Sequence, residues 1–346
     1  MIQSLRYAPF LAAVGKPSFF IWQNLNPMIR NQKLFAVFIA FDVVITVVIT
    51  LVLVRQFWQP EPDDGRLRVV VSIDPQACFV ERIGGDRVAV EVLVPAGKEP
   101  ETYTPTPGQI KRLARSHVFF RVGFPAETAL LPKLESVARR LKVVDTRESI
   151  RDDLRRPDPH GHNIHDDDHA NAPGCDCGVD GIDPHVWGSP ALVIRQAEAI
   201  RDTLITFDPD GRAEYEANCD RFVDDLAKLQ AEIREKLAPH VGKAIYVYHP
   251  TYGYFCDEFG LEQKAIEVDG KPPTPKSLAD WIGNVRRDEV RVIIVQPEFN
   301  RSAAEKVAQS TGAKLTAHST LSRDYFQSMR DLAKLIEEAH SQTVTQ

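Results

Sequence analysis

The sequence has few cysteines and no concentration of positive charge. Five cysteines scattered over 346 residues are too few for a disulfide scaffold, and the odd number leaves at least one unpaired within the chain. The net charge of -6, without clustered Lys and Arg, excludes the basic surface that nucleic-acid binding requires. Neither an HExxH nor a CxxC motif occurs, so no local spacing motif identifies a zinc site.

One long apolar run lies near the start of the chain. Residues 34–54 are interrupted only by Asp42, Thr46 and Thr50, and 21 helical residues at about 1.5 Å each span roughly 30 Å, the thickness of a bilayer core. The run predicts a single transmembrane helix. A cleaved signal peptide is the alternative, but its apolar region has usually about 7–15 residues, and Arg55 stands where a small-residue cleavage site is expected.

The charges around this run predict its orientation. Residues 1–33 carry Lys and Arg without acidic residues, whereas Asp and Glu dilute the positive charge in the polar linker of residues 55–67. Positively charged flanks stay on the cytoplasmic side. We therefore expect a single-pass protein of the cell membrane with a cytoplasmic N-terminus and an extracytoplasmic body, periplasmic or extracellular.

The body alternates strand-like apolar runs with helical patterns, which predicts an α/β fold. Two lobes are expected, residues 68–190 and 240–340, each a mostly parallel sheet wrapped by helices. The segment 191–239 joins them, and apolar residues recur every three to four positions over 214–237, which predicts one long rigid helix. The expected strands are residues 68–73, 88–94, 118–122, 143–144, 244–248, 264–268, 290–295 and 314–317.

Three short segments place a potential metal ligand in a loop that proline or a strand end restricts. They are residues 100–107 with Glu101, residues 183–190 with His185, and residues 248–255 with His249. A lone histidine is more often structural than a ligand, and a glutamate in a turn is usually only solvated. Since no spacing motif links the segments, composition alone favours these ordinary roles over a metal site.

An ordered set of motifs runs through the whole body. The zinc/manganese-type substrate-binding proteins of ABC importers resemble this chain in an ordered set of segments: SIDPQACFVERIGGDRVAVEVLVPAGKEPETYTPTP, DPHVW, HPTYGYFCDEFGL, EVDGKPPTPKSL, QPEFNRSAAEKVAQSTGAKL and RDYFQSMRDL. The resemblance covers about residues 68–336. It implies two α/β lobes joined by a long rigid helix, one divalent metal between them, and delivery of that metal to an ABC permease and its ATPase.

The resemblance also implies a set of ligands. The second and third histidines of the family fall on His185 and His249, while the first falls on Glu101, a carboxylate that still suits zinc or manganese. The final carboxylate of the family falls on Ser319. The adjacent His318 is a candidate for the fourth ligand, although a one-residue offset on a strand turns a side chain to the other face. A water or an unidentified carboxylate is the alternative.

A tract rich in histidine, aspartate and cysteine occupies residues 157–178. Histidine-rich loops stand at this place in zinc-directed members of the family, so the resemblance implies an accessory metal-binding loop. A solvated insertion without a role is the alternative. The cysteines would favour zinc over manganese if they stay reduced. Its candidate ligands are His160, His162, His165, His169, Cys175 and Cys177.

The expected function is therefore capture of a divalent ion, Zn²⁺ before Mn²⁺, as cargo for an ABC permease, without catalysis. One alternative is a membrane-tethered metal buffer or sensor without a transport role. The other is a zinc hydrolase that uses Glu101, His185 and His249 as a three-ligand site with a bound water.

Overall fold

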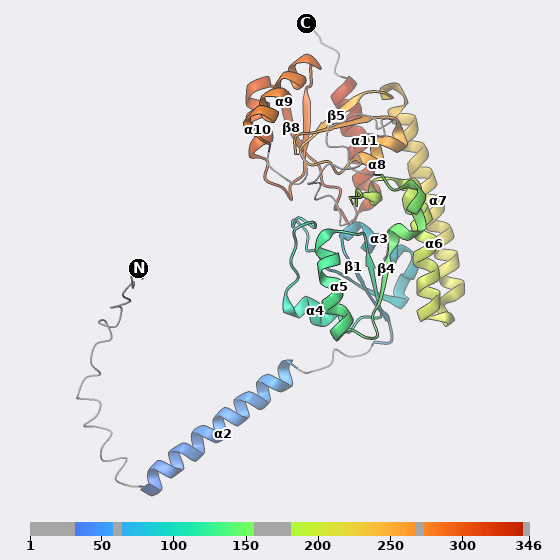
Figure 1. The fold of residues 1–346 in the computed structure, drawn as a ribbon. Helices are drawn as coiled ribbons and strands as arrows, with labels where there is room; N and C mark the ends of the chain where they lie inside the picture. The colour runs from blue at the N-terminus through green and yellow to red at the C-terminus, as the bar shows by residue number, and fades with distance from the viewer. Residues whose placement is uncertain (1–31, 58–63, 156–180, 268–272, 342–346) are drawn as a thin grey trace, which may run out of the picture. The chain divides into compact units, whose positions relative to one another are not determined.

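A computed structural model of the chain describes residues 32–57, 64–155, 181–267 and 273–341 (Figure 1). The chain divides into two compact units, Met1–Asp64 and Gly65–Gln346. The loop predicted at 157–178, with its six candidate ligands, lies entirely outside the described residues.

The first unit contains the helix α2, Gln32–Phe57, which includes the apolar run of residues 34–54. Large apolar side chains lie exposed on it, among them Val37, Phe41 and Leu51 with exposed fractions of 67%, 62% and 60%. A search of the described residues found no helix with the length and apolar character needed to cross a membrane. The helix is thus present, while the predicted membrane span is not supported.

The N-terminal lobe of the second unit is built on a four-stranded parallel sheet with the order β2-β1-β3-β4. The strands are short, and their buried faces are rich in Val and Phe. They are β1 Leu67–Val71, β2 Val88–Val92, β3 Val118–Arg121 and β4 Lys142–Asp145. The helices of this lobe are α3 Asp74–Gly84, α4 Pro107–Leu113 and α5 Pro125–Val137, with 3₁₀ turns at Gly85–Arg87 and Thr146–Asp153.

The C-terminal lobe repeats this arrangement, with a parallel sheet of order β6-β5-β7-β8. In both lobes the first and third strands are neighbours, so the chain reverses its direction of winding between them, and ligands of open α/β sheets bind at such switch points. The strands are β5 Ala244–Val247, β6 Glu262–Ala265, β7 Val292–Val295 and β8 Lys314–Ala317. The helices are α8 Gly253–Phe259, α9 Pro275–Arg287, α10 Ser302–Thr311 and α11 Tyr325–Ser341.

Two helices connect the lobes, α6 Pro190–Phe207 and α7 Arg212–Leu237, with 3₁₀ turns at Pro209–Gly211 and Ala238–His240. The 26 residues of α7 correspond to roughly 39 Å. The helix packs against α3 of one lobe and α11 of the other, and Phe222 contributes to the link because its ring lies 5.8 Å from Phe79 and 6.0 Å from Phe326. The prediction of two α/β lobes joined by a long helix is confirmed.

Proline sets the beginning of several helices. Its ring fixes the backbone in a helical conformation, and the amide hydrogen that it lacks is not needed in the first turn. In three helices the residue before the proline is also a cap, namely Thr106, Ser189 or Thr274. Its side chain accepts a hydrogen bond from the backbone amide three residues further on. The helices that begin with proline in the first two positions are α3, α4, α5, α6 and α9.

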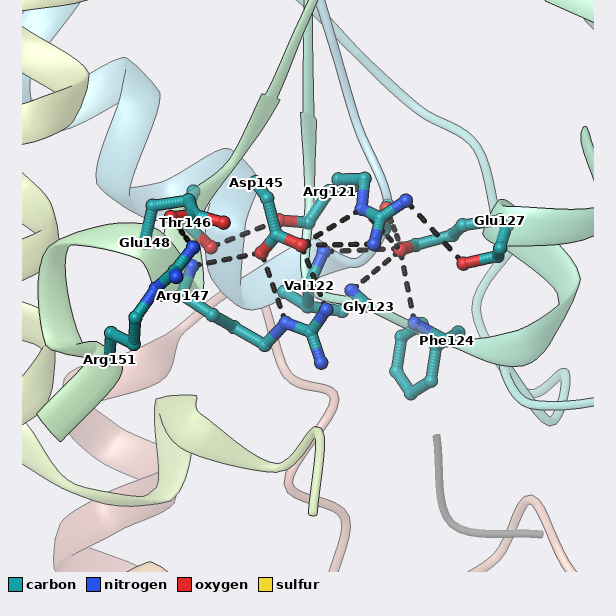
Figure 2. A network of polar contacts seen from close by, with 12 residues as sticks. Arg121, Val122, Gly123, Phe124, Glu127, Asp145, Thr146, Arg147, Glu148 and Arg151 are labelled. Carbon is teal, nitrogen blue, oxygen red and sulfur yellow. Dashed lines mark hydrogen bonds and ion pairs between the residues drawn. The ribbon is translucent and has the colours of Figure 1, made fainter. Parts of the chain in front are cut away.

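A buried polar network holds the loops at the carboxyl ends of β1, β3 and β4 (Figure 2). Glu127 accepts hydrogen bonds from the amides of Gly123 at 2.7 Å and Phe124 at 3.0 Å, and from the hydroxyl of Ser72. Asp145 pairs with Arg121 at 2.9 Å and with Arg147 at 2.8 Å. Most polar groups in this network have partners, which offsets part of the cost of burying the loops beneath the C-terminal lobe.

Gly123 is the position in this network that tolerates no side chain. Its φ is +93°, and an added Cβ would lie 1.9 Å from the guanidinium carbon of Arg147, which Asp145 holds in place. We expect Gly123→Ala to destabilise residues 65–346 by more than about 1 kcal/mol beyond Gly312→Ala. Gly312 is the matched control because its φ is +79° with open space beyond it. Urea unfolding of both variants measures this, and equal losses would contradict it.

Candidate metal centre

Glu101 lies in the loop between β2 and α4. This loop is fastened to the lobe by Gln109, whose amide nitrogen donates to the carbonyl of Leu93 at 2.7 Å, while Tyr103 donates to the Gln109 side-chain oxygen at 2.9 Å. The side chain of Glu101 is only 13% exposed. The carboxylate is therefore held on an anchored loop that faces the C-terminal lobe.

His185 follows Asp183 and Pro184, immediately before the turn that leads into α6. Its ring nitrogen Nδ1 lies 2.7 Å from Asp183 Oδ1, and its backbone amide donates to the same oxygen at 3.0 Å. Asp183 thus fixes the ring so that Nε2 points to Glu101, 3.4 Å away. The ring of Trp187 packs 5.2 Å from the imidazole, and Phe124 of the network in Figure 2 packs on Trp187.

His249 stands two residues after β5 in the C-terminal lobe. Its Nδ1 lies 2.9 Å from Glu267 Oε2, and its Nε2 lies 3.2 Å from Glu101 Oε1. The side chain of Gln296 binds both the backbone amide of His249, at 3.1 Å, and its carbonyl, at 2.8 Å. The ring of Phe299 stacks on the imidazole at 4.1 Å between centroids.

These three side chains converge. In the described part of the chain, one atom from each of Glu101, His185 and His249 lies within 4.8 Å of the others, and no other group of this kind is found there. Each histidine uses Nδ1 toward a carboxylate of its own lobe and leaves Nε2 for a shared occupant. A carboxylate behind a ligating histidine orients the ring and increases its basicity, which is the usual second layer of a metal site.

The electrostatics of the group in the absence of an ion follow from these contacts. Burial disfavours the protonated form of His249, but the carboxylates of Glu101 and Glu267 outweigh it and raise its pKa to about 10. Burial also disfavours the protonated form of His185, but the carboxylates of Asp183 and Glu101 outweigh this effect, so the pKa of His185 is raised as well. Burial opposes ionisation of Glu101, yet the two imidazoles hold its pKa well below the ordinary value. The proton on His249 therefore supplies positive charge that an ion would otherwise bring.

A small cavity adjoins the group and is about 10 Å³ in volume, roughly the space of one water-sized particle. Two imidazole nitrogens and a carboxylate oxygen form a donor set that suits Zn²⁺, and Mn²⁺ less well. The cavity is lined by Pro100, Glu101, His185, Trp187, Thr251, Gln296, Glu298, Phe299, Thr320 and Leu321.

Comparison with known proteins identifies the family. The family model described as ZnuA, zinc-uptake complex component A periplasmic, matches residues 69–339. The chain belongs to this ZnuA family. The high-affinity zinc uptake system protein ZnuA of Yersinia pestis is 32% identical over 257 residues, which are 71% of this chain and 80% of that protein.

The chain is also similar to a longer relative and to solved structures of ZnuA. The zinc-binding lipoprotein AdcA of Streptococcus pneumoniae is 28% identical over 72% of this chain, and the chain spans only 49% of AdcA. A crystal structure of ZnuA superimposes with a TM-score of 0.70 at 32% identity, covering 80% of this chain and all of that one. A ZnuA deletion mutant with zinc bound gives 0.69 at 31% identity, covering 81% and 100%.

His318 and Ser319, the residues considered for the fourth ligand position, lie apart from the group of Glu101, His185 and His249. His318 does not join the group, because its Nδ1 faces the hydroxyl of Tyr252 at 3.1 Å and its Nε2 faces the carbonyl of Ser328 at 2.9 Å. It stands just after β8, and both ring nitrogens are already engaged within the C-terminal lobe. Ser319 donates its hydroxyl hydrogen to Glu298.

The cysteines described in this ZnuA-family chain do not contribute to the site. Cys78, Cys219 and Cys256 are unpaired thiols, and burial raises the pKa of each. Neutral buried thiols are poor metal ligands. Cys175 and Cys177, with the predicted accessory histidines, lie outside the described residues, so their role stays a prediction.

The sequence alone did not identify the orienting groups Asp183, Glu267 and Gln296. The register of the sheet explains one of them, since Val247 of β5 pairs with Ala265 of β6, and His249 and Glu267 each stand two residues further on. The sequence does contain a signal for Asp183, because a carboxylate two residues before a histidine can bind both its backbone amide and its ring nitrogen.

Because the pKa of His249 is raised to about 10, this imidazole carries a proton at pH 7 that a metal must displace. We expect Zn²⁺ binding to release at least about one proton there, and affinity to rise by about tenfold per pH unit for each released proton. Calorimetric titrations in two buffers of different ionisation enthalpy measure the release. Glu267→Gln removes one cause of the raised pKa and should reduce the number of protons released. An enthalpy that does not depend on the buffer would contradict the account.

Proposed function

We propose that this protein captures a divalent metal ion outside the cytoplasm and delivers it to an ABC permease and its ATPase. Zn²⁺ is the first choice and Mn²⁺ the second. The observation that carries the proposal is the meeting of Glu101 and His185 with His249 of the other lobe, around space for one small particle. ZnuA of Yersinia pestis is named for high-affinity zinc uptake, and MntA of Halalkalibacterium halodurans, 26% identical, for manganese binding.

In this proposal Nε2 of His185, Nε2 of His249 and a carboxylate oxygen of Glu101 bind the ion directly. Asp183 and Glu267 hold the histidine rings with Nε2 free. One carboxylate offsets one of the two positive charges, and the neutral imidazoles add nitrogen donors that Zn²⁺ prefers over Mn²⁺. The long helix α7 favours a preorganised site over one assembled by large lobe movements.

Capture fits the site better than hydrolysis does. A zinc hydrolase requires a general base next to the bound water. Asp183 and Glu267, the carboxylates behind the histidines, are each committed to an imidazole nitrogen, and Glu298 on the cavity wall accepts the hydroxyl hydrogen of Ser319. A metal buffer or sensor would use the same ligands, and zinc uptake in cells that express the protein with and without its permease separates that role from transport.

The anchor is part of the proposal. The exposed apolar side chains of α2 are the reason for proposing it, because such a surface favours a lipid environment over water. If residues 34–54 attach the chain to the membrane, with 1–33 cytoplasmic and the body outside, the full chain should sediment with membranes. It should also resist extraction by carbonate. The body should then be cleaved only by protease added outside. Recovery of the full chain in the soluble fraction would contradict attachment.

Substitution of the ligands tests the function most simply. His185→Ala and His249→Ala should each weaken Zn²⁺ binding on the order of 100-fold or more, because each removes a first-layer ligand where even outer-layer losses reach about 10–100-fold. His240→Ala is the matched control, since His240 is a buried histidine that stacks on His340 and not on the site. Competition titration with a zinc chelator measures all three.

Deletion of residues 160–177 separates the cleft from the accessory loop. We propose that this loop adds weak sites only, so the tight site should persist in the deletion variant while additional weak zinc sites disappear. If the deletion abolished tight binding and the two histidine variants kept it, the loop would be the metal centre and the proposed ligands would be wrong.

A further inference from the structure

We propose that Glu298, positioned by Ser319, supplies a fourth ligand to the ion held by Glu101, His185 and His249. The inference rests on the proposed metal-binding function and adds a residue to its site. Structural and catalytic zinc sites are mostly four-coordinate, and the described chain brings only three donors together. The question is which group occupies the remaining position.

The strand order of the C-terminal lobe places Glu298 beside His249. β5 and β7 are hydrogen-bonded neighbours, and Tyr246 and Val247 pair with Ile293 and Ile294. His249 stands two residues beyond the end of β5, and Glu298 stands three beyond the end of β7. Both residues therefore emerge at the carboxyl edge of the sheet, at its switch point, where α/β folds bind their ligands.

Contacts on both sides of Glu298 tie its loop to His249. Gln296 binds the backbone of His249 through both its side-chain oxygen and its nitrogen, at 3.1 Å and 2.8 Å. Phe299 stacks on the imidazole ring with 17° between the planes. Glu298 lies between these two contacts along the chain, so its position relative to the imidazole is restrained from both directions.

Glu298 lines the same cavity as the other two ligands. These ligands are Glu101 and His185, and the volume of the cavity is about 10 Å³. A space of that size holds roughly one water-sized particle, so an occupant contacts several of the walls at once. Glu298 is half-buried here, and its carboxylate is the second acidic group of the cavity.

Ser319 holds the carboxylate by one oxygen. Its hydroxyl donates to Glu298 Oε1, and its own position is fixed because its oxygen accepts from the amide of Leu321 at 3.0 Å and its carbonyl accepts from Ser328 at 2.9 Å. A carboxylate has a second oxygen with free acceptor capacity for a cation. Ligating carboxylates are themselves usually hydrogen-bonded, and Ser319 fills this role.

Glu298 also completes the charge of the site. Two carboxylates balance the two positive charges of the ion, and a donor set of two nitrogens and two oxygens is harder than a set richer in imidazole. The site should therefore hold Mn²⁺ better than it would without Glu298. Ser319 stands where the sequence resemblance placed a carboxylate, and Glu298 delivers one to the site from the neighbouring strand end.

Glu298→Gln tests the ligand because the amide keeps the size of the side chain and an acceptor for Ser319 but loses the charge. In the full chain we expect Zn²⁺ affinity to fall about 10–100-fold, Mn²⁺ affinity to fall more, and the visible spectrum of bound Co²⁺ to change. Ser319→Ala should weaken Zn²⁺ binding about tenfold. Glu305→Gln is the control, since Glu305 lies exposed on α10 and pairs with Arg301.

A rescue variant separates a ligand from a structural residue. Ser319→Asp combined with Glu298→Gln returns a carboxylate to this side of the cavity, and we expect it to recover most of the lost affinity. An unchanged Zn²⁺ affinity and Co²⁺ spectrum in Glu298→Gln would overturn the inference, as would a loss that the rescue variant leaves in place. If His249→Ala also kept tight binding, the proposed function itself would fail.

Discussion

One oxygen of Glu101 faces both imidazoles across the boundary between the lobes, and the rest of the site depends on this contact. Oε1 lies 3.4 Å from His185 Nε2 and 3.2 Å from His249 Nε2, with all three side chains at least 87% removed from solvent by area. Buried charge is unfavourable unless it is paired. The two lobes therefore need a cation between them, which is a proton in the free protein and a metal ion in the loaded one.

The remainder of the fold keeps these groups in place before any ion arrives. Asp183 and Glu267 set the rings, and the buried network around Glu127 and Asp145 fixes the loops beneath Phe124 and Trp187. The helix α7 packs on both lobes and limits their separation. The type and geometry of the donor atoms decide which metal such a site selects. The intrinsic affinity order of the divalent metals does not by itself give the selectivity that a cell needs.

The sequence predicted most of the fold because its signals are local. Apolar runs marked all eight strands to within a few residues, and the spacing of apolar residues over 214–237 marked α7, observed as Arg212–Leu237. Glu101, His185 and His249 were found through short motifs and the family resemblance. The orienting role of Glu267 could not be found this way, since it follows from the pairing of Val247 with Ala265, which is set by the sheet and not by neighbours in the chain. The same holds for Glu298, which requires the order of β5 and β7.

Two predictions, His318 as a ligand and residues 34–54 as a membrane span, depended on interactions that the sequence does not show. His318 is adjacent to the expected position, but its ring is held by Tyr252 and Ser328, and proximity in sequence says nothing about such competition. The apolar composition of 34–54 correctly predicted a helix, while the surroundings of that helix depend on partners that composition does not specify.

X-ray absorption at the zinc edge of the loaded protein tests the central claim most directly, because it reports the atoms bound to the ion. The account predicts a shell of nitrogen and oxygen at about 2.0–2.1 Å with the outer-shell scattering of two imidazole rings and no sulfur. A sulfur shell at about 2.3 Å, or a shell without imidazole scattering, would contradict the assignment of the ion to Glu101, His185 and His249.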